Sequence, residues 1–467
     1  MEHRIHPKIT NRGVLPRCNS GGSVLQASVL AALLCGSSAS QALDFGPEGM
    51  FSLTGFAQAT VTMQNNYCLN CQVADSTASK QIRLSDSIIP GKSHGTVTTT
   101  NWQTQPYLAA KYNLGQGYEI SGLLSQRWRQ GTVNGTDIET RYGGTVDVPD
   151  FWYEKNLALS HPDYGSVRIG AMTTRGWSVA DYPYGGNLGV SDSWGASGAG
   201  YGMLGNAIRL GSRLLDIFEG DLYLELSYDR GNTNFQRLKP AFYELYAQYH
   251  KGDLVVDAMY QDTVNGSPGA WGHAPFSSVT PFSSDDSYVS AQGVRFSSNH
   301  QNIAMVMARY QVNAKVEVSG GIRHNQWSGN NSAFSDDTQQ SAGFNLDFSP
   351  GLANSYTGYP AASVDVMLGA RYRTARWTVL AGMVHLGTAD TSNPSDRGQF
   401  NSATFNTLGV KYEYAPGLQL EATTGVVRYA RQGLSPLSMP GNSSFSNVDS
   451  RISQDGTWLT LGITYGF

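Results

Sequence analysis

The feature that most constrains this chain is a period-two alternation of apolar residues with small or polar ones, which recurs along most of its length. In residues 51–62 (FSLTGFAQATVT), one face carries mainly Phe, Leu, Ala and Val, while the other carries mostly Ser, Thr and Gln. Successive side chains of a β-strand point to opposite faces, so such segments are predicted to be strands with one apolar face. The same pattern appears at 166–172, 221–230, 302–310, 315–323, 363–372, 418–427 and 457–467.

The spacing of these segments separates a closed barrel from a soluble β-sandwich. Seven strand pairs meet at very short turns, centred near residues 115, 163, 219, 252, 314, 375 and 416. Long polar stretches separate the hairpins, at 64–101, 130–149, 173–205, 263–300, 328–361 and 432–455. With one further strand at each end, this arrangement predicts an all-β fold, a closed antiparallel transmembrane β-barrel of 16 strands. Its short turns would be periplasmic and its long loops extracellular.

Two observations bear on the strand count and on closure of the barrel. Segments 288–296 and 342–348 also alternate, so 18 strands are the alternative to 16. In the last strand, the alternate residues ending in Tyr465 and Phe467 are expected to face lipid. This strand is expected to pair with residues 51–62 and so close the barrel.

Composition agrees with strands and excludes a nucleic-acid partner. The chain has 53 Gly and 25 Tyr, and only 15% of its residues are charged. Such a composition suits an extended β architecture better than packed helices. The net charge is −4 and there is no basic run, so no nucleic acid is expected to bind.

The N-terminal residues predict an export signal. A basic leader precedes the short apolar stretch VLQASVLAALLCG and then small residues, which together indicate a signal peptide at 1–42. The apolar run is too short for the ~20 residues that a membrane-spanning helix needs. Residues 43–467 are therefore expected to form a single transmembrane barrel domain.

Three segments carry a resemblance to a known family. YGSVRIGAMTTRG (164–176), LGNAIRLGSRLLDIFEGDLYLELSYDRG (204–231) and the terminal ITYGF resemble the general diffusion porins of Gram-negative bacteria. The resemblance implies a 16-stranded outer-membrane homotrimer whose third loop folds inward and narrows a water-filled pore. Small hydrophilic solutes would pass through this pore passively. The alternative is an 18-stranded substrate-specific channel.

The resemblance also implies partners. Outer-membrane lipid and lipopolysaccharide would surround such a barrel, and the barrel-assembly machinery would insert it. The terminal aromatic, Phe467, resembles the signal that this machinery reads.

The phase of the strands identifies basic side chains that point into the lumen. An arginine on the lipid side would cost ~2–4 kcal/mol near mid-membrane, so arginines on the polar face are expected to point inward. Arg323 and Arg371 follow this rule, and pairing with Glu154, Glu225 or Glu244 is the alternative role for such arginines. The candidate constriction residues on the wall are Arg127, Arg129, Arg168, Arg209 and Arg213.

The stretch 173–203 is expected to be the inward loop. It carries only two carboxylates, Asp181 and Asp192. The resemblance implies that these acids stand opposite the arginines and set up a transverse field across the pore. The excess of basic candidates predicts a weak anion preference, unless the folding of the loop reverses that balance.

The remaining motifs point away from catalysis. Cys68 and Cys71 form a CxxC pair, which in an exported chain is expected to be a local disulfide. No βαβ pattern surrounds it for redox chemistry, Gln72 stands where haem attachment needs His, and no second ligand pair is present for zinc. No G-x-S-x-G or H-E-x-x-H motif occurs, so no enzyme, metal or cofactor is expected. Adhesion or receptor binding through the long loops is a third possibility.

Overall fold

The computed structural model describes most of the expected barrel. It covers residues 42–67, 95–133, 136–142, 152–191, 193–194, 203–230, 241–264, 300–328, 361–388, 390–391, 402–429 and 455–467. Several expectations lie outside these residues and stay predictions: the signal peptide up to residue 41, the disulfide of Cys68 and Cys71, the role of Asp192, and strands at 288–296 and 342–348.

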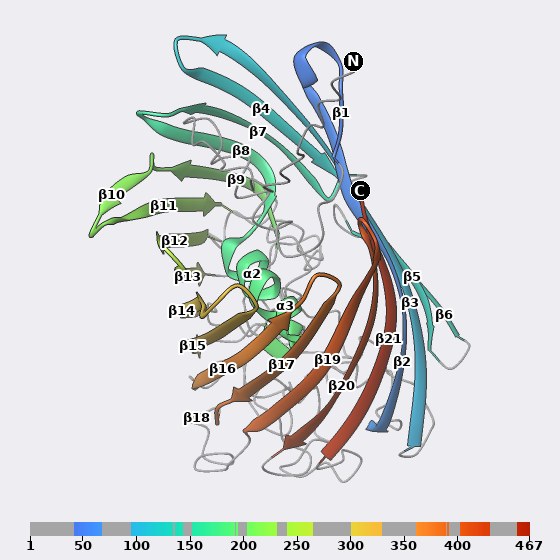
Figure 1. Cartoon of the computed structure of the whole chain (residues 1–467). Helices are drawn as coiled ribbons and strands as arrows, with labels where there is room; N and C mark the ends of the chain where they lie inside the picture. The colour runs from blue at the N-terminus through green and yellow to red at the C-terminus, as the bar shows by residue number, and fades with distance from the viewer. Residues whose placement is uncertain are drawn as a thin grey trace, which may run out of the picture.

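The strands form a closed antiparallel barrel of 16 strands, as the alternation and spacing predicted (Figure 1). The third barrel strand consists of two pieces, β4 and β5. In chain order the barrel strands are β2 (Phe51–Tyr67), β3 (Gly95–Gly115), β4 (Tyr118–Ser125) with β5 (Arg127–Val133), β7 (Glu154–His161), β8 (Gly165–Thr173), β9 (Met203–Gly211), β11 (Gly220–Asp229), β12 (Ala241–Lys251), β13 (Leu254–Val264), β14 (His300–Gln311), β15 (Val316–Ser328), β16 (Ala361–Arg373), β17 (Trp377–Leu386), β19 (Ala403–Ala415), β20 (Leu418–Tyr429) and β21 (Asp455–Gly466). Short additional elements are β1 (Leu43–Phe45), η1 (Pro47–Gly49), β6 (Thr136–Tyr142), β10 (Leu215–Ile217) and β18 (Asp390–Thr391).

The first and last barrel strands close the sheet. β2 pairs with β21 from Phe56 opposite Gly466 to Asn65 opposite Thr457. Beyond the end of this ladder, the backbones of Gly55 and Phe467 exchange two hydrogen bonds, of 2.8 and 3.0 Å. Closure removes the unpaired sheet edges that lipid could not satisfy, and the expected partnership of the two strands is confirmed.

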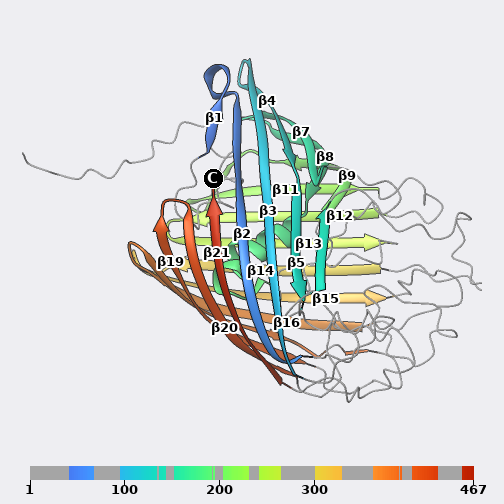
Figure 2. The same cartoon turned by 90° about the vertical axis from the view of Figure 1, so that its right-hand side faces the viewer.

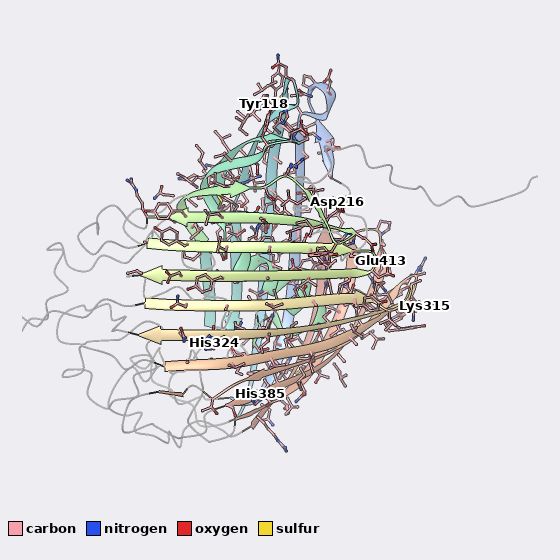
Figure 3. The ribbon with its side chains drawn as sticks, turned by 90° about the vertical axis from the view of Figure 1, so that its left-hand side faces the viewer. Tyr118, Asp216, Lys315, His324, His385 and Glu413 are labelled. Carbon is pink, nitrogen blue, oxygen red and sulfur yellow. The ribbon has the colours of Figure 1, made fainter. Side chains whose placement is uncertain are left out.

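The short turns gather at one end of the barrel. Each of the seven predicted hairpins is present, from β3–β4 to β19–β20. Figure 3 shows Asp216, Lys315 and Glu413, which lie in or beside three of these turns, at one end of the strands. We refer to this end as the periplasmic rim.

Side chains alternate between lipid and lumen as expected. On β11, Leu224 and Leu226 are exposed on the outer face, whereas Glu225 and Ser227, which alternate with them, are buried on the inner face. Further along the outer face, Leu368 is 51% exposed. An outward apolar face is what a bilayer requires.

The sheet forks at Gln126, which the sequence did not predict. β3 pairs with β4 near the periplasmic rim and with β5 farther from that rim. β4 continues to β7, while β5 turns back as the hairpin β5–β6 inside the stretch expected to be a loop. At the fork the side-chain oxygen of Gln126 accepts the backbone N–H of Arg127 at 2.7 Å. This bond satisfies a donor where the ladder breaks.

The described helical residues between β8 and β9 lie inside the barrel (Figures 1 and 2). They comprise α2 (Arg175–Val179), the turn η4 (Ala180–Gly185) and α3 (Gly186–Leu188). We call residues 174–191, with 193 and 194, the inner segment. None of the helices described is long and apolar enough to cross a membrane.

Candidate functional site

The inner segment begins at a carboxylate on the barrel wall. Glu244 on β12 accepts the backbone N–H groups of Arg175 and Gly176, each at 2.7 Å, on its two oxygens. Thr174 caps α2 by accepting the N–H of Trp177 at 3.2 Å. The first turn of a helix leaves backbone donors unpaired, and a carboxylate there satisfies them. Glu244 therefore fixes the point at which the chain enters the lumen.

Two arginines complete this anchor. The side chain of Arg175 donates two hydrogen bonds to Glu225 on β11, one of them with Nη2 2.7 Å from Oε1. Arg209 on β9 is buried, donates to the Ser227 hydroxyl at 2.7 Å, and lies 3.9 Å from Glu225 and 3.8 Å from Glu244. Charges buried together compensate one another. Arg209 thus has the structural pairing that the sequence left as the alternative to a pore-lining role.

The middle of the inner segment is held by hydroxyl groups. The Tyr184 hydroxyl donates to Asp257 on β13 at 2.7 Å, and Tyr246 donates to the other oxygen of this carboxylate at 2.6 Å. Burial raises the pKa of Tyr184 well above its ordinary value, and the charge of Asp257 raises it further. The phenol therefore stays protonated and keeps donating. Further along, Thr407 donates to the carbonyl of Leu188 at 2.8 Å.

Glycines in the wall let the inner segment approach closely. A Cβ added to Gly382 on β17 would stand 2.6 Å from the Leu188 carbonyl oxygen. One added to Gly369 on β16 would stand 2.6 Å from both terminal methyl groups of Leu188. A larger residue at either position would push the segment away from the wall.

The described end of the inner segment is held by a buried ion pair. Arg323 on β15 is fully buried and donates to Asp365 on β16, with Nη2 2.8 Å from Oδ2. Its Nη1 donates to the Trp194 carbonyl at 2.6 Å, and its guanidinium lies 4.5 Å from the centre of the indole ring. The inward phase predicted for Arg323 places it here, where it anchors the segment.

Between these polar anchors the wall behind the inner segment is apolar, whereas the sequence rule assigned polar residues to the whole lumen face. The segment covers this part of the wall and excludes water, so burial of apolar surface stabilises the contact. The contact includes Trp177, Tyr184, Leu188 and Trp194 of the segment. Its buried wall residues are Met172, Leu204, Ala207, Phe242, Tyr246, Met259, Met305, Met307, Met367, Val384, Leu386, Ala403, Phe405 and Val427.

The wall formed by β2, β3 and β21 carries uncharged polar groups on its inner face. Gln58 bonds to Gln103 at 2.5 Å and to Thr464 at 3.2 Å. Thr62 and Thr460 share a hydrogen bond of 2.8 Å. On the opposite side, helix α2 packs against β12 and β13, and helix α3 packs against β16, β17 and β19. This polar wall therefore lines the other side of the lumen.

Arg127 and Asp181 come together where the inner segment faces the polar wall. Arg127 donates to Gln103 at 3.1 Å, and its guanidinium lies 5.9 Å from the centre of the Trp177 ring. Asp181 in η4 accepts a hydrogen bond from Ser191. Burial raises the pKa of the Asp181 carboxyl to about 6, while the positive charge of Arg127 acts in the opposite direction. One arginine and one acid of the candidate set thus interact electrostatically across this part of the lumen.

Two other candidates, Arg168 and Arg213, lie apart from this pair, and the side chain of a third is not described. Arg168 on β8 donates to Asn156 at 2.5 Å and is half-buried. Arg129 pairs through its backbone with Gln103 on β3, and its side chain lies outside the described part of the structure. Arg213 is exposed and follows the end of β9 near the periplasmic rim. Among the described side chains, Arg168 and Arg213 are not brought together with Asp181.

Sequence reasoning missed several residues that position the inner segment. Arg175 was not singled out, and neither were Asp257 and Asp365 on the wall. The two wall acids sit in the inward phase of apolar strands, between residues that face lipid. A carboxylate in that position needs a buried hydrogen-bonding partner. This requirement was the signal in the sequence that a segment inside the barrel contacts these two acids.

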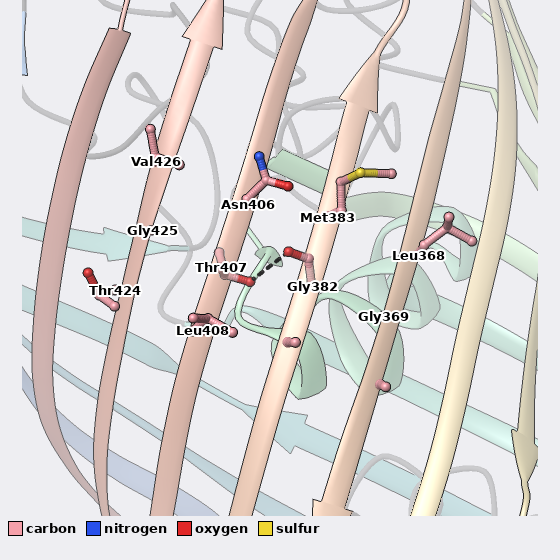
Figure 4. Close-up of a pocket in the computed structure, with 12 residues that line it drawn as sticks. Leu368, Gly369, Gly382, Met383, Asn406, Thr407, Leu408, Thr424, Gly425 and Val426 are labelled. Atoms are coloured by element: carbon pink, nitrogen blue, oxygen red, sulfur yellow. Dashed lines mark hydrogen bonds between the residues drawn. The ribbon is translucent and has the colours of Figure 1, made fainter.

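A hollow of about 610 Å³ in the wall between β16 and β20 is separate from the pore (Figure 4). Among its lining residues, Leu368, Met383, Leu408 and Val426 belong to the outward phase of their strands. The hollow therefore opens on the lipid side.

Comparison with known proteins shows similarity in structure only. No family model and no curated protein sequence matches the chain. The anion-selective porin from Comamonas acidovorans matches with a TM-score of 0.51 at 13% identity, over 89% of this chain and 99% of that one. The outer-membrane expressed OmpT of Vibrio cholerae gives a TM-score of 0.50 at 11% identity, over 91% and 100%. A loop L8 deletion mutant of that protein gives 0.51 at 11% identity, over 90% and 100%.

At such identities the similarity concerns the fold. The closed antiparallel barrel of 16 strands matches the porin fold. The resemblance of the sequence to porins, and the outer-membrane location that this resemblance implies, agree with the fold. The chain has the fold of the bacterial outer-membrane porins.

Proposed function

We propose that the protein is an outer-membrane porin through which small hydrophilic solutes and ions diffuse passively. The observation that carries the proposal is the inner segment, which is anchored at its start, middle and described end inside a closed barrel. A segment fixed in this way narrows a lumen without filling it, because it lies against one wall. The 18-stranded substrate-specific channel is not favoured by a barrel of 16 strands.

The chemistry of the lumen supports passive transport. Hydroxyl and amide groups on β2, β3 and β21, such as Gln58 and Thr460, exchange hydrogen bonds with water and solutes without demanding one ligand. Passive diffusion needs no catalytic step, and we propose that the protein is not an enzyme.

A weak anion preference follows from the charges near the narrowing. Arg127 and Arg168 point inward from the wall, and Asp181 is the described acid of the inner segment that faces Arg127. One of the structural matches is named an anion-selective porin. In a salt gradient, the reversal potential should show the anion to be the more permeant ion.

Assembly and surroundings are proposed from the family resemblance. We expect a cleaved signal peptide, insertion by the barrel-assembly machinery and a homotrimer surrounded by lipid and lipopolysaccharide. Chemical cross-linking of the native membrane tests the trimer directly.

The test of the main proposal uses the purified full-length protein in planar bilayers and in liposomes. A porin gives step-like conductance, and neutral sugars enter the liposomes at rates that fall with sugar size and do not saturate. Absence of conductance steps, or of sugar entry, would refute the proposal.

A further inference from the structure

Four basic side chains gather on the inner face near the periplasmic rim, beneath the inner segment. They are Arg309 on β14, Arg371 and Arg373 on β16, and Lys411 on β19, and we call them the basic arc. Arg309 and Arg373 lie close to the short turns that follow their strands. A solute that has passed the inner segment meets this group on its way out.

The basic arc carries more positive than negative charge. Glu317 on β15 lies 2.7 Å from Nε of Arg371 and 3.8 Å from Nη2 of Arg373. Glu421 on β20 lies 3.9 Å from Nζ of Lys411. Four cations therefore share these two carboxylates. Asp257 on β13 adds a third carboxylate near Arg309, so the arc keeps a net charge of about +1 by this count.

Donor groups of the arc are only partly used. Nε of Arg309 is buried and makes no hydrogen bond within the described residues. Arg373 donates to Gln311 at 2.8 Å, yet its side chain keeps 32% of its surface exposed. A guanidinium presents five N–H donors, so Arg373, and the half-buried Arg309 through its groups other than the buried Nε, have donors left for a ligand.

The inner segment covers the basic arc. Nζ of Lys411 lies 3.5 Å from the Gly186 carbonyl oxygen, and Tyr182 lies within electrostatic range of Arg373. The arc thus lies between a fixed segment and the barrel wall. Contact with such a wall lowers the solvent screening of charge.

We propose that the basic arc is a binding site for phosphate-like oxyanions that leave the pore toward the periplasm, an inference that rests on the proposed porin function. The planar guanidinium fork matches the oxygen spacing of phosphate and binds it through two parallel hydrogen bonds. Chloride has no such pair of acceptors. Arg309 and Arg373 provide the donors, and Lys411 adds a point charge.

The test is single-channel recording of the full-length protein in potassium chloride with inorganic phosphate added, at a pH where phosphate is a dianion. Phosphate is expected to reduce the chloride current saturably, and more strongly from the short-turn side. Arg373→Gln and Arg309→Gln should each raise the half-blocking concentration about ten- to a hundredfold, as loss of a charge-assisted hydrogen bond does. Glu421→Gln should lower it, because the arc loses a compensating carboxylate.

The matched control is Lys251→Gln. Lys251 is exposed at the same rim, and its ammonium lies 2.9 Å from Glu219, so its loss should leave the block unchanged. A current that falls in simple proportion to phosphate, or variants that match the control, would overturn the site while leaving the porin proposal intact. A chain without conductance steps would overturn both.

Discussion

Glu244 offers the sharpest test of how the inner segment is held. Its side chain is completely buried, and its two oxygens accept the N–H groups of Arg175 and Gly176. Gln261 donates to Oε2 at 2.7 Å, and Arg209 lies 3.8 Å from Oε1. The substitution Glu244→Gln keeps the shape of the side chain but removes its charge and one acceptor.

The expected cost follows from these contacts. A hydrogen bond to a charged group contributes ~1.5–3 kcal/mol, and a buried donor left without a partner costs ~1–3 kcal/mol. The glutamine keeps one oxygen for one of the two backbone donors, and its amide group faces the other. We therefore expect the free energy that holds α2 to the wall to fall by about 2–4 kcal/mol. This loss raises the detached population roughly 30- to 1,000-fold.

Two measurements report this loss. Urea unfolding of the protein in detergent micelles, followed by tryptophan fluorescence, measures the change in stability. Single-channel recording measures whether the segment leaves its position, since detachment produces current fluctuations and admits larger neutral sugars. The matched control is Glu219→Gln, which removes the charge of a glutamate whose side chain is 86% exposed at the periplasmic rim.

The reasoning is refuted if Glu244→Gln behaves like Glu219→Gln in both assays. Loss of stability with unchanged current noise and sugar cut-off would show that Glu244 stabilises the barrel without holding the segment. Such a result would also remove the main support for an anchored constriction.

Three further changes probe the lumen and the closure of the barrel. Because burial raises the pKa of Asp181 to about 6, lowering the pH through this value neutralises the carboxylate and should increase anion selectivity in reversal-potential measurements; Asp181→Asn should abolish this pH step. Gly382→Ala places a Cβ 2.6 Å from the Leu188 carbonyl oxygen, so we expect a loss of about 1–3 kcal/mol in urea unfolding and a changed conductance. Deletion of Phe467 should lower the yield of heat-resistant folded barrel on gels more than it alters the conductance of inserted molecules, because Phe467 pairs with Gly55 at the closing strands.

Each of these three predictions has a result that would contradict it. A pH step that survives in Asp181→Asn would assign the titration to another group. Gly320→Ala is the control for Gly382→Ala, since its Cβ would meet a terminal methyl group of Leu368 at 3.3 Å and the Met367 carbonyl oxygen at an ordinary 3.6 Å. Equal effects of the two would argue against close packing of the inner segment. Normal assembly without Phe467 would remove the proposed role of the terminal aromatic.

The barrel was predictable because its determinants are local. Period-two alternation, short turns and long polar stretches can be read segment by segment, and the hairpins from β3–β4 to β19–β20 follow from them. The β5–β6 hairpin was missed although Asn134–Gly135 stands between its strands, and Asn-Gly is a strong hairpin signal. It lies in a stretch read as loop, because polar residues on both faces hide the alternation.

The site was predictable only in part. Strand phase correctly turned Arg209 and Arg323 inward, but it did not show which partner each would meet. The segment around residues 302–310 carries apolar residues on both faces, with Met305 and Met307 inward and Val306 outward. Both faces are apolar because lipid covers one and the inner segment covers the other.

The sequence by itself determined the 16 barrel strands, their order, the side that faces lipid and the closure of β2 on β21. These properties depend on neighbours in the chain and on a uniform solvent, the bilayer, which acts alike on every strand. Only the tertiary structure decided that Glu244 and Arg323 hold the inner segment, whereas Arg127 faces Asp181. Those roles depend on contacts between residues far apart in the chain, and such contacts exist only once the barrel has closed around the segment.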